Sequence, residues 1–191
     1  MENGKRTDSL KIAVESIKKG GVILSPTDTI YGLSCDATNA EAIDKIRAIK
    51  GRKKEKPFIV LVNSDRLFNQ CTADVPEVAW DLIDNASSPL TLVLPASNFL
   101  PEVLRPNQMV GIRYVKEGYV ADLIHRVNRP IVSTSANLSG EEAAKSFSEI
   151  DPRIFDQVDY AVPEEFDQSS ENSASKIIRL QANGSVEILR K

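Results

Sequence analysis

The segment from Gly21 to Val62 most constrains the fold, because it places two short apolar runs on either side of a helix-like stretch. Val22 to Leu24 is short, apolar and mostly β-branched, which is typical of a buried strand. Pro26 ends that strand, since proline lacks a backbone donor and favours an extended residue before it. Phe58 to Val62 predicts the second strand. This order of strand, helix and strand predicts an α/β fold.

The composition is that of an ordinary globular domain. The chain has 191 residues, of which 41% are hydrophobic and 27% charged, and this is enough for one domain with a real core. A net charge of -3 argues against general coating of nucleic acid. No run approaches the ~18 apolar residues of a membrane span, and the N-terminus lacks a signal-peptide core. We expect a cytoplasmic protein in which Cys35 and Cys71 are reduced thiols.

The remaining periodicities predict alternating helices and strands, with no internal repeat or linker. Asp8 or Ser9 suits the cap of a first helix, so residues 1–9 are expected to form a flexible tail. Thr38 and Glu41 match a capping box that opens a second helix ending at Lys50 and Gly51. We expect helices at 10–20, 38–50, 76–83 and 119–127, a weaker one at 148–155, and strands at 89–95, 109–115, 131–133, 160–162, 175–180 and 186–189. These elements predict one α/β domain over residues 10–191, a twisted mixed sheet flanked by helices.

Two loops near the C-terminus carry further signals. Residues 164–173 are acidic and polar, so they could form a mobile lid. Asn183 and Gly184 separate the last two predicted strands, and this dipeptide is a strong signal for a β-hairpin turn.

Polar residues gather directly after the first predicted strand, where ligands bind in open α/β sheets. They are Thr27, Asp28, Thr29 and Tyr31. A cluster of cations then precedes the second strand: Lys50, Arg52, Lys53, Lys54 and Lys56. Such a cluster is often only a solvated surface run. Between a helix end and a strand it also suits a polyanion, and we interpret the whole stretch as half of a nucleotide site.

Several common catalytic devices are missing from the sequence. It has no Walker A loop, no Gly-x-Gly-x-x-Gly and no Gly-x-Ser-x-Gly motif. His125 is the single histidine, and we expect a structural or surface role for it, with a pKa switch as the alternative. Without a histidine or cysteine nucleophile, we expect catalysis by positioning of substrates and stabilisation of transition-state charge, as in phosphoryl or nucleotidyl transfer.

Two further features each allow two interpretations. Arg113 interrupts an otherwise apolar strand, so it must either pair with a core carboxylate or grip a ligand carboxylate from a cavity. The stretch from Ser133 to Gly140 could be an ordinary capped turn. It could also be a cradle of hydroxyls and amides for phosphate or ribose oxygens.

Taken together, these motifs resemble the YrdC-like (TsaC) family of threonylcarbamoyl-AMP synthases. Pro26-Thr-Asp-Thr-Ile-Tyr-Gly-Leu33 is similar to the family's first motif, and Lys50-x-Arg52 with Ser135-x-Asn137 matches its Lys-x-Arg and Ser-x-Asn signature. The other matching segments, in family order, are Pro89–Leu94, Gly111–Arg113, Ser133–Gly140 and Ile188–Arg190. The resemblance covers roughly residues 10–190 and implies a YrdC-like fold with a concave basic ligand cleft.

The resemblance implies a reaction of L-threonine, bicarbonate and ATP that gives threonylcarbamoyl-AMP and pyrophosphate, for t6A37 modification of tRNA by a separate transferase. It implies that Lys50 and Arg52 are catalytic. The implied ATP contacts, with Mg²⁺, are Lys50, Arg52, Lys56, Ser135, Asn137 and Arg190. The implied threonine contacts are Thr29, Arg113, Ser133 and Ser175, with Arg113 gripping the carboxylate.

The sequence departs from the family pattern at several positions. Leu61 stands where many members have histidine, Ser87-Ser88 replaces Pro-Gly, and Ala143 replaces a serine. Lys176-Ile-Ile-Arg179 replaces Thr-Val-Val-Asp and reverses the charge beside Ser175. Two alternatives remain open: a module that binds double-stranded RNA or tRNA, and a YciO-like paralogue without synthase activity. A steep salt dependence without ATP turnover would favour the first.

Overall fold

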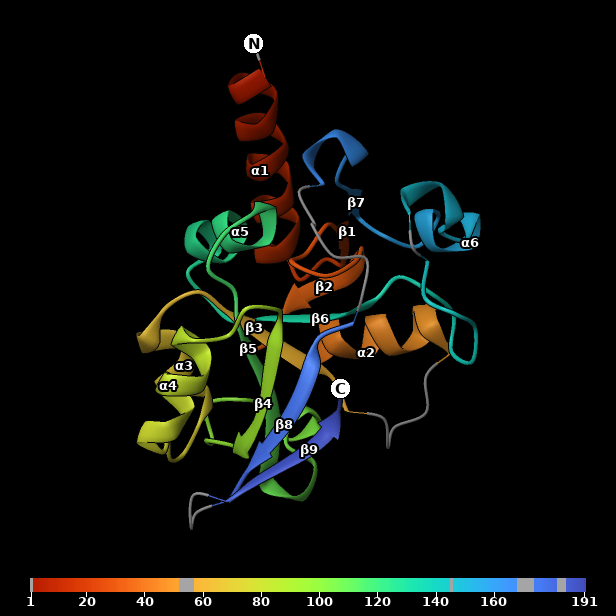
Figure 1. The fold of residues 1–191 in the computed structure, drawn as a ribbon. Helices are drawn as coiled ribbons and strands as arrows, with labels where there is room; N and C mark the ends of the chain where they lie inside the picture. The colour runs from red at the N-terminus through yellow and green to blue at the C-terminus, as the bar shows by residue number, and fades with distance from the viewer. Residues whose placement is uncertain (1, 52–56, 145, 168–173, 182–184) are drawn as a thin grey trace.

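A mixed sheet of nine strands, in the order β7-β1-β2-β6-β3-β5-β4-β8-β9, organises the described part of the chain (Figure 1). The computed structural model describes residues 2–51, 57–144, 146–167, 174–181 and 185–191. The strands are β1 Ile23–Ser25, β2 Gly32–Asp36, β3 Ile59–Val62, β4 Leu90–Pro95, β5 Met109–Tyr114, β6 Ile131–Ser135, β7 Tyr160–Ala161, β8 Lys176–Leu180 and β9 Val186–Arg190.

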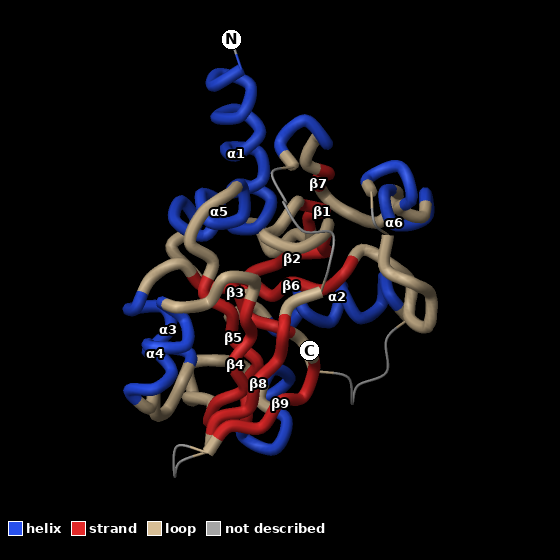
Figure 2. Tube along the Cα trace, viewed as in Figure 1, coloured by secondary structure: helices blue, strands red, loops and turns tan. Residues whose placement is uncertain are grey.

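Helices surround this sheet (Figure 2). They are α1 Glu2–Lys18, α2 Ala40–Lys50, α3 Asp65–Cys71, α4 Glu77–Asp84, α5 Tyr119–Val127 and α6 Pro152–Phe155, with short 3-10 turns at Glu102–Leu104, Pro106–Gln108, Phe147–Glu149 and Glu164–Phe166. In the view of Figure 2, α1 and α5 lie side by side at the top, and α3 and α4 lie at the left.

Strand pairing confirms the predicted mixed sheet. β1 and β7, β3 and β5, and β4 and β8 run parallel, while the other neighbours run antiparallel. The strands at the centre of the sheet are apolar and buried, and all of β2 is inaccessible to solvent. Ile43, Ile46 and Ile49 of α2 are buried in the same core, which confirms the apolar side predicted for that helix.

The predicted start of the first helix was wrong. α1 begins at Glu2 and takes in the segment expected to be a tail. Arg6 explains the extra turns, because its guanidinium pairs with Asp122 of α5 at 2.7 Å and lies 5.7 Å from the centre of the Tyr119 ring. Tertiary contact with α5 therefore supports helix before Asp8, which local capping preferences do not reveal.

The predicted cap of the second helix was also wrong. Asn39 caps α2, and its side-chain oxygen accepts from the Ala42 amide at 3.1 Å. Thr38 instead donates its amide and its hydroxyl to Asp36, at 2.8 and 2.7 Å. The end of the helix was predicted correctly, because Gly51 adopts the left-handed conformation with φ of 57°.

One helix was missed and other boundaries differ slightly. The missed helix is α3, since a seven-residue helix gives little periodicity. β6 continues to Ser135, two residues beyond the prediction. β8 and β9 pair antiparallel as predicted, although the turn at Asn183 and Gly184 lies outside the described residues. Of the proposed lid, Glu164–Phe166 form a 3-10 turn, and 168–173 lie outside the described residues.

Candidate functional site

A cavity of about 940 Å³ lies over one face of the sheet, where strand pairing brings side chains from distant segments into two rows. One row crosses five strands and consists of Ser133, Ile59, Gly111, Val93 and Arg179. The next row consists of Arg113, Thr91, Ile177 and Arg190. All nine residues line the cavity. The floor of the site is therefore a product of sheet register.

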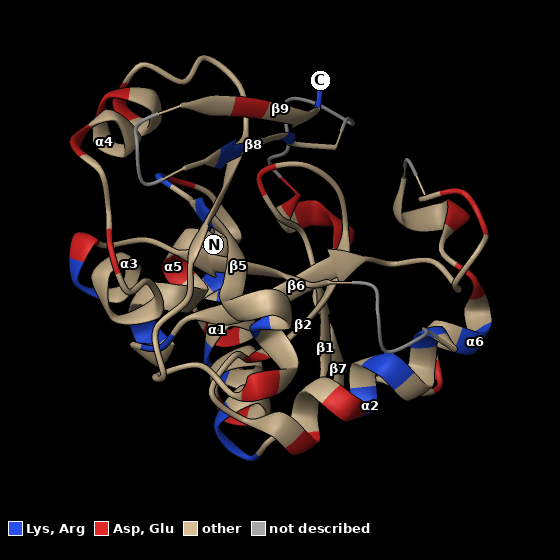
Figure 3. Ribbon diagram, turned by 90° about the horizontal axis from the view of Figure 1, so that it is seen from below, with Lys and Arg blue, Asp and Glu red and all other residues tan. Residues whose placement is uncertain are grey.

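The charged side chains that line the cavity, among the described residues, are three arginines and no carboxylate. They are Arg113, Arg179 and Arg190. Elsewhere acidic and basic residues are spread over the helices, as Figure 3 shows for α2. Arg113 pairs with Asp28 at 2.9 Å and Arg179 with Glu187 at 3.0 Å. Although the whole chain has a net charge of -3, the charged groups on the described wall of the cavity are all cations, and this favours an anionic ligand.

Arg113 is the most deeply buried of these cations, with 5% of its side chain exposed. Its Nη2 lies 2.9 Å from Oδ1 of Asp28, and its Nε has no hydrogen-bond partner. Burial raises the pKa of the Asp28 carboxyl above its ordinary value, and the charge of Arg113 partly opposes this. The guanidinium thus has a counter-ion, and its buried Nε–H lacks a hydrogen-bond partner.

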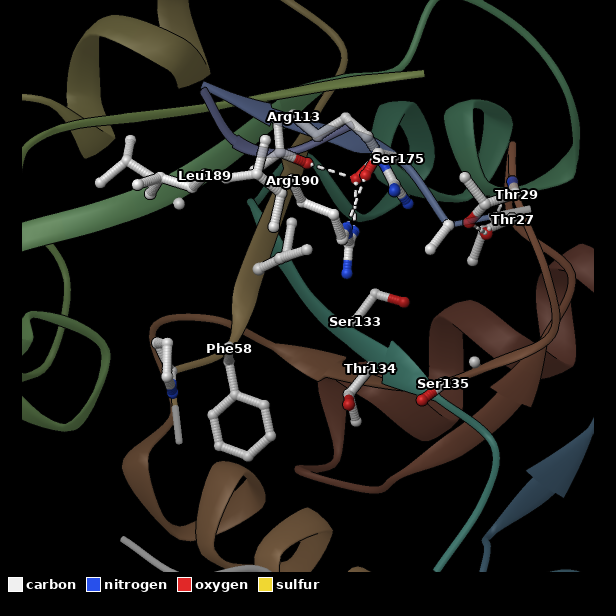
Figure 4. A pocket seen from close by; sticks show the side chains of 18 of the residues that line it. Thr27, Thr29, Phe58, Arg113, Ser133, Thr134, Ser135, Ser175, Leu189 and Arg190 are labelled. Carbon is white, nitrogen blue, oxygen red and sulfur yellow. Dashed lines mark hydrogen bonds between the residues drawn. The ribbon is translucent and has the colours of Figure 1, made fainter. Parts of the chain in front are cut away.

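Arg190 and Ser175 form a second polar group at the cavity (Figure 4). Arg190 donates from Nε to the Ser175 carbonyl at 2.8 Å and from Nη2 to its hydroxyl at 3.2 Å. The same hydroxyl lies 2.8 Å from Oγ1 of Thr91, which is fully buried on β4. These contacts fix the last strand, β9, against the segment that enters β8.

Lys50 is buried behind the cavity wall, with 4% of the residue exposed. Its Nζ donates to the carbonyl oxygens of Ser135 and Asn137, and lies 3.3 Å from the Asn137 side-chain oxygen. The Ser135 hydroxyl donates to that same oxygen. Lys50 therefore holds the turn that presents Ser135 to the cavity.

The structure brings most of the predicted site together. Thr29, Arg113, Ser133, Ser135, Ser175 and Arg190 line the cavity. Lys50 and Asn137 lie directly behind Ser135 and do not line it. Arg52 and Lys56 lie outside the described residues, so their predicted phosphate contacts stay predictions.

The polar lining residues that were given no role from the sequence include Thr91 and Arg179, and Thr27 was noted only as a polar residue after the first strand. Each is a polar residue in or beside a mostly apolar strand, the signal that identified Arg113. Asp28 was noted only as a polar residue of the turn, and its pairing with Arg113 depends on tertiary contact.

The remaining candidates lie outside the cavity. His125 is exposed on α5, which confirms the predicted surface position. Cys35 and Cys71 are free and buried. Within the described residues, no group of three His, Cys, Asp or Glu side chains could hold a metal ion, and no helix is long and apolar enough to span a membrane.

Comparisons with known proteins identify relatives of this chain. A family model, Sua5/YciO/YrdC, described as "Telomere recombination", matches residues 15–191. A threonylcarbamoyl-AMP synthase of Bos taurus is 35% identical over 150 residues, covering 78% of this chain and 54% of that protein. One from Hydrogenovibrio crunogenus is 35% identical over 142 residues, covering 70% of this chain and 75% of that protein.

Solved structures show the same fold. P. abyssi Sua5 complexed with L-threonine matches with a TM-score of 0.87 and 28% identity, over 95% of this chain and 53% of that one. E. coli YciO matches with a TM-score of 0.82 and 24% identity, over 97% of this chain and 89% of that one, which supports the fold alone. The chain spans about half the length of the bovine and P. abyssi relatives. This chain belongs to the Sua5/YciO/YrdC family.

Proposed function

We propose that this protein is a threonylcarbamoyl-AMP synthase, a nucleotidyltransferase that converts L-threonine, bicarbonate and ATP to threonylcarbamoyl-AMP and pyrophosphate. The observation that carries the proposal is buried Arg113, which faces a cavity lined by hydroxyls and two further arginines. Such a site suits a small carboxylate beside a polyphosphate. The names of the bovine and bacterial relatives, and the L-threonine in the P. abyssi complex, support the choice.

The proposal divides the cavity into two ends. At the amino-acid end, Arg113 would grip the threonine carboxylate, with Thr29, Ser133 and Ser175 beside it. At the nucleotide end, Ser135 would contact ATP, supported by Lys50 and Asn137. Arg190, which is bonded to Ser175, would lie between the two ends and contact ATP from there. Arg52 and Lys56, from the basic loop outside the described residues, are proposed to hold phosphates.

The chemistry needs positioning and positive charge. The threonine amine and bicarbonate give a carbamate with loss of water, and a carbamate oxygen then attacks the α-phosphate and expels pyrophosphate. Negative charge develops on the phosphate oxygens and on the leaving group, so fixed cations lower the barrier. Arg179 and Arg190 of the cavity, with the proposed contacts of Lys50 and Arg52, are suited to this task.

The described residues do not supply a metal centre. Mg²⁺ is therefore proposed only as the ion that accompanies ATP, held through the phosphates, and no step is assigned to it. We further propose that the adenylate passes to a separate transferase for t6A modification of tRNA, and that this occurs in the cytoplasm.

The test is pyrophosphate release from ATP by the purified chain. We expect release that requires both L-threonine and bicarbonate, and a threonylcarbamoyl-AMP product detectable by mass spectrometry. Folded protein that binds ATP without such release would contradict the synthase and favour a YciO-like paralogue. Protein that binds double-stranded RNA or tRNA in a salt-dependent manner and does not bind ATP would favour the RNA-binding module.

A further inference from the structure

The loop between β1 and β2 presents two threonine hydroxyls to the cavity (Figure 4). Thr27 and Thr29 are both buried, with 7% and 4% of each residue exposed. Their Oγ1 atoms lie 2.9 Å apart. Because a hydroxyl has one proton to donate and two lone pairs that accept, the direction of this hydrogen bond follows from the other contacts of each atom.

The proton and both lone pairs of the Thr27 hydroxyl take part in hydrogen bonds within the protein. Its Oγ1 lies 2.7 Å from the carbonyl oxygen of Ile30, which can only accept, so Thr27 donates its proton there. The backbone amide of Thr29 donates to the same Oγ1 at 3.1 Å. The second lone pair is left for the Thr29 hydroxyl, which must therefore be the donor of the 2.9 Å hydrogen bond.

The hydroxyl of Thr29 thus donates its proton to Thr27. Toward a ligand it can act only as a hydrogen-bond acceptor, through its lone pairs. We infer that Thr27 is a positioning residue that makes the Thr29 hydroxyl a hydrogen-bond acceptor, so that the ligand group bound there is an N–H or O–H donor. Ionised carboxylates and phosphates can only accept. They are therefore excluded from this position in the cavity.

This inference rests on the proposed function and deepens it. L-Threonine carries two kinds of donor, its amine and its β-hydroxyl, and one acceptor-only group, its carboxylate. Arg113 lies in the same cavity and is paired to Asp28, the residue between the two threonines. The carboxylate would thus bind at Arg113 while a donor of the same molecule binds at Thr29, which fixes its orientation.

The experiment is a double-mutant cycle on the dissociation constant for L-threonine, measured by calorimetry with the full chain. We expect T27V and T29V each to weaken binding by about fivefold to tenfold, the value of one hydrogen bond. T27S keeps the hydroxyl and should restore binding to within about twofold of wild type. The double variant T27V/T29V should bind no more weakly than T29V alone. If the loss of affinity in T27V/T29V equals the product of the losses in T27V and T29V, the inference is overturned, because Thr27 then acts independently of Thr29.

L-2-Aminobutyrate, which lacks the β-hydroxyl, identifies the donor. If the β-hydroxyl binds at Thr29, the preference of wild type for threonine over aminobutyrate disappears in T29V. If the amine binds there, both ligands lose affinity by the same factor in T29V. The second result requires an acceptor at Thr29, because an ammonium group can only donate. The first places the β-hydroxyl at Thr29, and the double-mutant cycle then decides the direction of the hydrogen bond. Equal affinity of wild type and T29V for each ligand would overturn the inference.

Thermal unfolding and the dissociation constant for ATP control for misfolding. Should T27V fail to fold, T29V and the aminobutyrate comparison still decide the question. Wild-type protein that neither binds L-threonine nor forms the adenylate would overturn both this inference and the proposed function. Tight threonine binding that T27V leaves unchanged would overturn the inference alone.

Discussion

Arg113 both forms an ion pair in the core and lines the cavity, so the two roles predicted for it do not exclude each other. The sequence allowed either a core ion pair or a ligand grip, because both shield a buried charge. In the structure Arg113 lines the cavity and also pairs with Asp28 through Nη2. The ion pair offsets part of the cost of burial, and the buried Nε–H is left without a partner.

Arg113→Ala tests this at the level of substrate binding. We expect the KM for L-threonine to rise by about 10-fold to 100-fold, the loss expected for a hydrogen bond to a charged group, with a much smaller change in the KM for ATP. Steady-state kinetics with each substrate varied in turn is the measurement. Arg66→Ala, an exposed arginine bound to Gln70, is the matched control. An equal rise for both substrates would refute the assignment of Arg113 to threonine.

Lys50 is more structural than its motif indicates. From the sequence it was expected to hold phosphates, and that contact stays a prediction. The structure shows an ammonium buried among oxygens of Ser135 and Asn137. Removal of the ammonium would take a charged donor from all three oxygens. The Ser135 carbonyl would keep the Asn137 amide and the Asn137 side-chain oxygen would keep the Ser135 hydroxyl, which leaves the Asn137 carbonyl most affected.

Lys50→Met should therefore lower the free energy of unfolding as well as the activity. We expect a loss of about 1–3 kcal/mol, the penalty for unsatisfied buried acceptors, measured by urea unfolding. Lys45→Met is the control on the same helix, since Lys45 is exposed and donates to the Gly20 carbonyl. It should cost less than about 0.5 kcal/mol. A stable Lys50→Met protein without activity would show that Lys50 acts on the substrate alone.

At the scale of elements, the close packing of β2 against β6 positions Ser133, Thr134 and Ser135 in the wall of the cavity. Gly32 pairs with Ser135, and a Cβ built at Gly32 would lie 2.7 Å from Oγ of Ser133 and 3.0 Å from the Thr134 carbonyl oxygen. Both distances are shorter than normal contacts. A side chain at Gly32 would therefore displace residues that line the cavity.

Gly32→Ala should destabilise the fold by about 1–3 kcal/mol, as expected for overpacking, and weaken threonine binding through Ser133. Gly4→Ala is a control for which we expect a gain, and not a loss, of stability. Gly4 lies in α1 with nothing within 4 Å of an added Cβ, so alanine there should stabilise by about 0.5–1 kcal/mol. Urea unfolding of both variants is the measurement. A Gly32→Ala protein as stable as wild type would contradict the close packing described here.

At the scale of the whole molecule, one core buries several groups that ionise only at high pH. Burial raises the pKa of the Cys71 thiol from 9.0 to about 12 and that of the Tyr119 hydroxyl from 10.0 to about 12. It also raises the pKa values of Cys35 and Tyr31. For each group the folded pKa exceeds the unfolded one, so the folded state favours the protonated form.

Stability should therefore be constant at neutral pH and fall as pH rises above 9, the ordinary pKa of a thiol. For Cys71 alone the loss between pH 7 and 10.5 should be about 2 kcal/mol. Urea unfolding of wild type and Cys71→Ala at pH 7, 9 and 10.5 measures this. The difference between the two proteins should move in favour of Cys71→Ala as pH rises. A difference independent of pH would contradict the raised pKa.

Local signals in the sequence were enough to predict the α/β class and most strands and helices, because short apolar runs and prolines mark them. Arg113 stood out as a charge in an apolar strand, while the roles of the other site residues followed from the family resemblance. Tertiary structure alone decided that α1 begins at Glu2, that Asp28 pairs with Arg113, and that Lys50 lies behind Ser135. It also decided which residues share a row of the sheet. Such contacts join segments far apart in the chain, so they depend on strand order and register, which local periodicity does not encode.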